Sequence, residues 1–190
     1  MIRPRKIFGG LGNQLFQYAY IYSQARSGLI PDIYIQDPKY FEAHKDEIRS
    51  LYSGDIKPID MVSLHVRRGD YVNNPFYVDL AETDYYDEAM AVFPDSKFLV
   101  FCADRQPGSD DGQDMKWCKE RFKGRQFAFY QGADELKDFN TMAGCKAHII
   151  ANSSFSWWAA YVSGNKTVAP KQWFTDGRPG IPFPANWITI

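Results

Sequence analysis

Residues 65–71 combine an imidazole, two guanidinium groups, a glycine and a carboxylate in one short stretch. They directly follow an apolar run over residues 61–64 that is typical of a buried strand. Ligands of open α/β sheets bind beyond the carboxyl ends of the strands, so we expect the chemistry of this protein here. Arginine suits phosphate because its planar guanidinium donates two parallel, charge-assisted hydrogen bonds. The alternative is a salt bridge between Asp70 and a neighbouring arginine at the end of the strand.

The two arginines of this stretch, Arg67 and Arg68, are adjacent in the sequence. Neighbouring side chains of a strand point to opposite faces of the sheet. Both arginines can therefore contact the same anion only if the strand has ended before them.

A glycine-rich turn over residues 9–14 separates an expected short strand from an expected helix. Free backbone amides at the start of a helix can hold an anion or a nucleotide phosphate. The spacing matches neither a Walker loop nor the dinucleotide fingerprint, so a tight turn with Asn13 as the helix cap is the alternative. The candidate contacts in this turn are Gly10, Gly12 and Asn13.

Polar residues also follow two other expected strands. Asp104 comes just after the strand expected over residues 97–102, a common place for an acid that binds ribose hydroxyls or a base edge. Residues 152–156 form a turn rich in hydroxyl groups between a strand and a helix, where serines and backbone amides can hold a phosphate. Ordinary helix capping is the alternative for these serines. They are Ser153, Ser154 and Ser156.

Strand and helix signals alternate from residue 61 onward, which predicts an α/β protein with a parallel, Rossmann-like sheet. A linker over residues 53–58 divides the chain into a region 1–60 and a domain 61–190, and the tail after Pro170 is expected to be irregular. Strands are expected over 6–8, 33–35, 61–64, 97–102, 127–130, 147–151 and 167–169. Helices are expected over 15–26, 40–51, 84–93, 114–122, 135–143 and 154–162.

The composition limits the classes of function. With 190 residues, 45% of them hydrophobic, the chain fits one domain or one domain with a small appendage. A net charge of −1 gives no basis for binding nucleic acid, and no apolar run is long enough for a transmembrane helix, so membrane association is at most peripheral. Three cysteines without Cys-x-x-Cys spacing and the lack of a signal-peptide pattern indicate a cytoplasmic protein. No Asp-x-Asp triplet supports metal-bridged diphosphate binding.

Taken together, these segments resemble the α-1,2-fucosyltransferase family, and the chain looks like a shortened, glycosyltransferase family 11-like member. Residues 9–19 are similar to the N-terminal signature of the family. Residues 65–72 are similar to the motif shared by α-1,2-, α-1,6- and protein O-fucosyltransferases, and residues 153–161 resemble the C-terminal motif of the α-1,2 group. The chain departs from the family where residues 105–116 precede the Trp-Cys-Lys of the middle motif. It is also shorter between the first two motifs.

The resemblance implies a GT-B-type fold. In that fold, residues 61–190 form a Rossmann-like GDP-sugar-binding domain, and residues 1–60 form a reduced N-terminal α/β region on the acceptor side. It also implies inverting transfer of L-fucose from GDP-β-L-fucose to the 2-hydroxyl of a galactose in a glycan. The expected partners are GDP-fucose and a galactoside acceptor, and neither a metal nor another cofactor is expected.

Roles for individual residues follow from the same resemblance. Arg67 corresponds to the arginine that grips the diphosphate, His65 to a histidine beside the nucleotide, and Arg68 to a supporting cation. Asn13 is similar to an asparagine that reaches the donor phosphate or the reacting sugar. Asp70 either orients Arg67 or accepts the acceptor proton, and both roles are open. The other expected donor contacts are Gly10, Gly12, Asp104, Ser153, Ser154 and Ser156.

Three alternatives stand beside this interpretation. A shortened, non-catalytic relative would bind GDP-sugar or glycan without transfer. A second alternative is fucosyl transfer with another linkage. The third, a nucleotide-binding α/β protein unrelated to sugar transfer, does not account for four motifs in the family's order.

Overall fold

The computed structural model describes residues 9–27, 36–102, 112–132 and 134–190. Its centre is a six-stranded sheet in the order β3-β2-β1-β4-β5-β6, in which each pair of neighbouring strands is parallel. The prediction of an α/β protein with a parallel, Rossmann-like sheet is confirmed. The strands are β1 (Ile59–Val66), β2 (Phe98–Cys102), β3 (Phe127–Phe129), β4 (Cys145–Ile149), β5 (Lys166–Ala169) and β6 (Ile188–Thr189).

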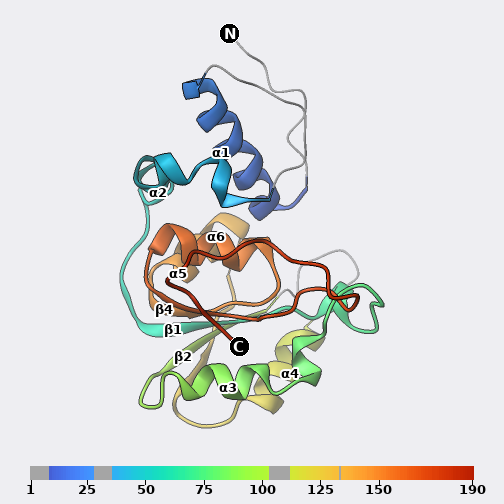
Figure 1. Ribbon diagram of the computed structural model, residues 1–190. Coiled ribbons are helices and arrows are strands. Elements are labelled where there is room, and N and C mark those ends of the chain that lie inside the picture. The colour runs from blue at the N-terminus through green and yellow to red at the C-terminus, as the bar shows by residue number, and fades with distance from the viewer. Residues whose placement is uncertain (1–8, 28–35, 103–111, 133) are drawn as a thin grey trace.

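Helices cover both faces of the sheet (Figure 1). Helices α3 (Tyr85–Ala91) and α4 (Gln113–Arg121) pack on one face, whereas α5 (Glu135–Ala143) and α6 (Ser154–Ser163) pack on the other. These helices lie close to the expected ranges, because parallel strands require crossover segments whose helical periodicity is easy to detect. No helix in the described part of the chain is long and apolar enough to cross a bilayer.

Strand β1 is longer than the sequence predicted. Expected over residues 61–64, it extends to Val66, which is buried and pairs with Cys102 of β2. His65 therefore lies within the strand, and Arg67 is the first residue beyond it. The candidate site residues 65–71 thus begin inside the sheet and not in a loop.

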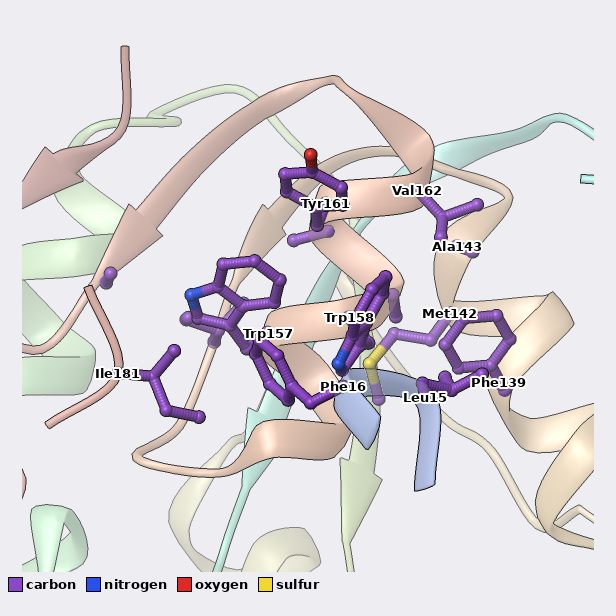
Figure 2. Packing of buried hydrophobic residues seen from close by; sticks show 14 of the residues in the cluster. Leu15, Phe16, Phe139, Met142, Ala143, Trp157, Trp158, Tyr161, Val162 and Ile181 are labelled. Atoms are coloured by element: carbon purple, nitrogen blue, oxygen red, sulfur yellow. The ribbon is translucent and has the colours of Figure 1, made fainter. Parts of the chain in front are cut away.

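The N-terminal region packs on the sheet domain through aromatic side chains. Phe16 lies against the indoles of Trp157 and Trp158, with ring centroids 4.7 Å and 4.8 Å apart (Figure 2). Phe41 stacks on Trp158 at 5.3 Å. Both tryptophans are fully buried, so the region and the sheet domain share one core. The region's helical elements are α1 (Leu11–Ser27), η1 (Pro38–Tyr40), η2 (Glu42–His44) and α2 (Lys45–Tyr52).

Two elements expected in this region, the strands over 6–8 and 33–35, lie outside the described residues. The described residues before β1 contain no strand. Helix α1 begins at Leu11, earlier than expected, which places Gly12 and Asn13 in its first turn.

Acid is expected to destabilise this fold through two buried histidines. Burial lowers the pKa of His148 to about 3; burial, together with the charge of Arg67, does the same for His65. Below pH 6.5, the usual pKa of histidine, both histidines are protonated in the unfolded chain but stay neutral in the folded chain. The free energy of unfolding should therefore fall by about 1.4 kcal/mol per pH unit for each histidine as the pH drops from about 6 towards 4.

Urea unfolding at pH 7, 6 and 5 measures this dependence. His148→Gln removes one of the two buried histidines, so the free energy of unfolding should fall less steeply as the pH is lowered. A flat stability profile across this pH range would contradict the neutral, buried state of both rings.

Candidate functional site

A cleft of about 1310 Å³ lies at the carboxyl ends of the central strands. It is lined by the turn before α1, the ends of β1, β2 and β3, the turn before α6, and the C-terminal tail. This is the position expected for a ligand of an open α/β sheet. The structure brings eight of the predicted site residues together around it: Gly10, Gly12, Asn13, His65, Arg67, Asp70, Ser153 and Ser154.

Arg67 is held at the wall of this cleft. Its Nη2 atom donates to Asp70 Oδ1 at 2.7 Å, and its guanidinium lies 5.0 Å from the centre of the Tyr71 ring. The side chain is only 13% exposed, and its buried Nε has no hydrogen-bond partner among the described residues. A buried donor without a partner is costly, so this atom fits a ligand that completes its hydrogen bonding. Asp70, tied to Arg67, is placed to orient it.

Arg68 points away from the cleft. Its guanidinium lies 4.4 Å from the centre of the Trp117 ring, and its Nε is 3.5 Å from Asp114 Oδ1 at the start of α4. The two arginines diverge beyond the end of β1, where Arg68 has a backbone conformation that is neither helical nor extended (φ −121°, ψ −118°). Arg68, predicted to contact the substrate, instead links the segment after β1 to α4.

The N-termini of α1 and α6 meet at the cleft. A Cβ atom on Gly12 would lie 2.5 Å from the carbonyl carbon of Ser154 and 2.6 Å from the backbone nitrogen of Phe155. The glycine therefore lets the two helix starts approach closely. Both ends carry the partial positive charge of a helix N-terminus, which favours an anion between them, and the Glu135 carboxylate already binds the first amide of α1.

Asn13 is oriented by two donors. The Ser154 hydroxyl donates to Asn13 Oδ1 at 3.1 Å, and the Gln36 amide donates to the same oxygen. Holding the oxygen in this way leaves the amide nitrogen of Asn13 as the end available to a ligand in the cleft. The first backbone amide of α1, Leu11 N, donates to Glu135 Oε1 of α5 at 3.0 Å.

His65 is a neutral group at the floor of the cleft. It is 5% exposed, and its low pKa follows mainly from burial and secondly from the charge of Arg67. Its Nδ1 has no hydrogen-bond partner within the described structure. A neutral ring suits hydrogen bonding to a ligand, not proton transfer at neutral pH.

Ser153, Ser154 and Ser156 do not act alike. Ser153 and Ser154 line the cleft, whereas Ser156 is fully buried inside α6 and donates to the carbonyl of Ser153 at 3.4 Å. Residues two apart on a helix lie on different faces, so Ser154 and Ser156 cannot share a ligand. Ser156 was predicted to contact the sugar-nucleotide donor, but its side chain is buried in the core and does not line the cleft. Asp104 lies outside the described residues.

Sequence reasoning missed two sides of the cleft. One carries the carboxylates of Asp134, Glu135 and Asp138, and the other carries Tyr77, Phe174 and Arg178. An aromatic content of 16% is the only signal for the second group, because aromatic residues line clefts as well as cores. Across the described ranges, no group of three or more His, Cys, Asp or Glu side chains is arranged to hold a metal.

Comparison with known proteins identifies the family. The sequence profile of glycosyl transferase family 11 matches residues 7–190. The chain belongs to this family. An α-1,2-colitosyltransferase of Escherichia coli is 32% identical over an alignment of 185 positions, which covers 82% of this chain and 60% of that protein. The bovine galactoside 2-α-L-fucosyltransferase SEC1 is 27% identical over an alignment of 167 positions, which covers 78% of this chain and 43% of that protein.

The chain spans about three fifths or less of the length of these relatives. A second E. coli protein, an O-antigen biosynthesis glycosyltransferase, is 26% identical over 88% of this chain and 62% of its own length. No solved structure matches the chain.

Proposed function

We propose that this family 11 protein transfers L-fucose from GDP-β-L-fucose to the 2-hydroxyl of a galactose in a glycan, with inversion and without a metal. The observation that carries the proposal is the convergence of Arg67 with the N-termini of α1 and α6 on one cleft. This arrangement suits a diphosphate. The names of the bovine and E. coli relatives support the sugar class and the linkage.

Stabilising the leaving diphosphate is the main catalytic task in this proposal. Inversion proceeds by one displacement, with the acceptor oxygen opposite the departing GDP. Arg67 and the helix ends are fixed before the reaction, and such preorganised donors typically contribute about 3 kcal/mol each to the transition state. The neutral ring of His65 and the amide of Asn13 add hydrogen bonds beside the phosphates.

The proposed organisation is that of a GT-B enzyme, with residues 61–190 binding the donor and residues 1–60 forming a reduced acceptor side. The parallel sheet, which begins at Ile59, supports the first part. The position of the first turn of α1 supports the second, because Asn13 lines the cleft from α1. We propose a cytoplasmic site of action, for which the cysteine pattern is the support.

Transfer of colitose is a second candidate. It is supported by the E. coli relative, which is an α-1,2-colitosyltransferase and is 32% identical to this chain. The two reactions share the diphosphate site and differ only in the sugar that is transferred. A direct comparison of the two donors at equal concentration separates them.

Calorimetric titration with GDP, ADP and UDP, followed by donor turnover, tests the proposed function. We expect GDP to bind at least tenfold more tightly than ADP or UDP, and GDP-fucose to be consumed when lactose is added. GDP binding without release of fucose to lactose or water would identify a non-catalytic relative. Equal binding of the three nucleotides would contradict a GDP-sugar site.

A further inference from the structure

Two segments far apart in the sequence form one wall of the cleft. Tyr77 and Phe174 form an antiparallel bridge, flanked by hydrogen bonds from Val78 N to the Trp173 carbonyl (3.1 Å) and from Thr175 N to the Phe76 carbonyl (3.1 Å). In Figure 1 these segments are the green chain after β1 and the dark red tail, which run side by side. The C-terminal tail is thereby fixed over the cleft.

Asn152 anchors this wall to the end of β4. Its Nδ2 donates to the carbonyls of Val78 at 2.9 Å and Trp173 at 3.1 Å, so one amide holds both segments. The Tyr71 hydroxyl donates to the carbonyl of Asn152 at 3.1 Å. Asn152 is 1% exposed, and these bonds tie the wall to the interior of the protein.

The wall is a row of three aromatic rings with a guanidinium at each end. Tyr71 and Tyr77 are stacked, with centroids 4.1 Å apart, and Phe174 follows Tyr77 at 5.4 Å. Arg67 lies over Tyr71, and Arg178 lies 4.1 Å from the centre of the Phe174 ring. A guanidinium stacked on a ring keeps its N–H edge available for hydrogen bonds in its own plane.

Arg178 is the more available of the two cations. Among the described residues that line the cleft, Arg67 and Arg178 carry the two basic side chains. Arg67 is buried and bound to Asp70 at 2.7 Å, whereas Arg178 is 54% exposed and its Nε is 3.6 Å from Asp176. Arg178 can therefore reach a ligand without breaking a short ion pair.

The cleft is polarised along the sheet. Asp134 and Asp138 lie on the β3 side, Glu135 lies against the start of α1, the diphosphate site lies at β1 and β4, and the wall lies towards β5. In a sugar nucleotide the diphosphate separates the nucleoside from the sugar. The carboxylates of Asp134 and Asp138 accept hydrogen bonds from N–H and hydroxyl groups, so they suit the nucleoside. The sugar and its acceptor then lie on the side of the wall.

We propose that Tyr77, Phe174 and Arg178 form the acceptor site, which binds a pyranose of the acceptor glycan. The Arg178 guanidinium donates to its hydroxyl oxygens, and the aromatic edges of the wall pack against its C–H groups. This inference rests on the proposed function, because it takes the diphosphate to lie at Arg67. It adds the C-terminal tail to the acceptor side, which the proposed function otherwise places in residues 1–60.

Lactose binding to the GDP-saturated protein tests the acceptor site by calorimetry. Arg178→Ala is expected to weaken lactose binding about tenfold, the effect of losing one charge-assisted hydrogen bond, while GDP affinity changes less than twofold. In turnover assays the KM for lactose should rise about tenfold with kcat unchanged. Arg178→Lys keeps the charge but loses the planar guanidinium, so its affinity for lactose should lie between those of the wild type and Arg178→Ala.

Arg121→Ala is the matched control. Arg121 also pairs with an aspartate, Asp87 at 2.6 Å, and lies over a phenylalanine, Phe122 at 5.5 Å, but it does not line the cleft. It should leave lactose and GDP binding unchanged, and thermal unfolding confirms that each variant is folded.

Three results would overturn the acceptor site. Loss of GDP affinity in Arg178→Ala would make Arg178 a diphosphate contact instead. Unchanged lactose binding in that variant would remove Arg178 from the site. Absence of lactose binding by the wild-type GDP complex would also contradict it, whereas failure of GDP itself to bind would contradict the proposed function.

Discussion

Arg67→Ala is expected to abolish sugar transfer, with kcat/KM lowered about a thousandfold. Arg67 lies at the carboxyl end of β1, 13% exposed, with a buried Nε that lacks a protein partner in the described residues. In the proposed reaction its guanidinium balances the charge of the departing diphosphate, and preorganised donors of this kind have large effects on kcat. Alanine should also weaken GDP binding, because the contact is made in the ground state as well.

Steady-state kinetics and GDP titration of Arg67→Ala and Arg67→Lys measure this effect. Lysine keeps the positive charge but lacks the planar guanidinium, so Arg67→Lys is expected to retain more transfer activity than Arg67→Ala. Transfer by Arg67→Ala at the wild-type rate would refute the assignment of the diphosphate site.

Asp70→Asn separates the two roles of Asp70. If Asp70 orients Arg67 through the 2.7 Å contact, the variant should lose about tenfold in both GDP affinity and kcat/KM. If Asp70 is the base, kcat alone should collapse while GDP affinity is kept.

Gly12→Ala is expected to damage both the fold and the site. Its Cβ would lie 2.5 Å from the Ser154 carbonyl carbon, and backbone atoms cannot move aside without separating α1 from α6. Overpacking of this kind costs about 1–3 kcal/mol of unfolding free energy. Displacing α1 also moves Asn13, and a displacement of about 1 Å is expected to reduce transfer about a hundredfold.

Gly54→Ala is the matched control, because nothing lies within 4 Å of the added methyl group at that position. Thermal unfolding and transfer assays of both variants measure the difference. If Gly12→Ala and Gly54→Ala behave alike, the close approach of α1 and α6 is not needed for the site.

The sheet and its covering helices followed from local patterns. The periodicity of residues 135–143 and 154–162 located α5 and α6 closely, because each helix places one apolar stripe on the sheet. β1 extended further than expected because His65 interrupts the apolar run while still facing the interior. A polar residue within a buried strand is invisible to a pattern that follows hydrophobicity alone.

Some of the candidate site residues could likewise be predicted from the sequence, and others could not. Arg67 and Asp70 are predicted from residue type and spacing, and Asn13 from the family resemblance; all three line the cleft. The divergence of Arg68 could not be predicted, because it depends on the backbone conformation just beyond the end of β1. Ser156 was predicted to contact the ligand together with Ser154. Both lie on α6, and two residues apart on a helix they lie on different faces, so only Ser154 lines the cleft. The pairing of Tyr77 with Phe174 brings together distant segments without regular strands, so no local signal predicts it.

The aromatic contacts of Phe16 and Phe41 with Trp158 also govern how the molecule folds and moves. These rings have their apolar partners in α6, so the described residues before β1 and the sheet domain should unfold in a single cooperative transition. A hinge between the two parts would have to pull buried indoles into water. The walls of the cleft are therefore set during folding, and binding of the proposed sugar nucleotide should need no large closure to assemble them.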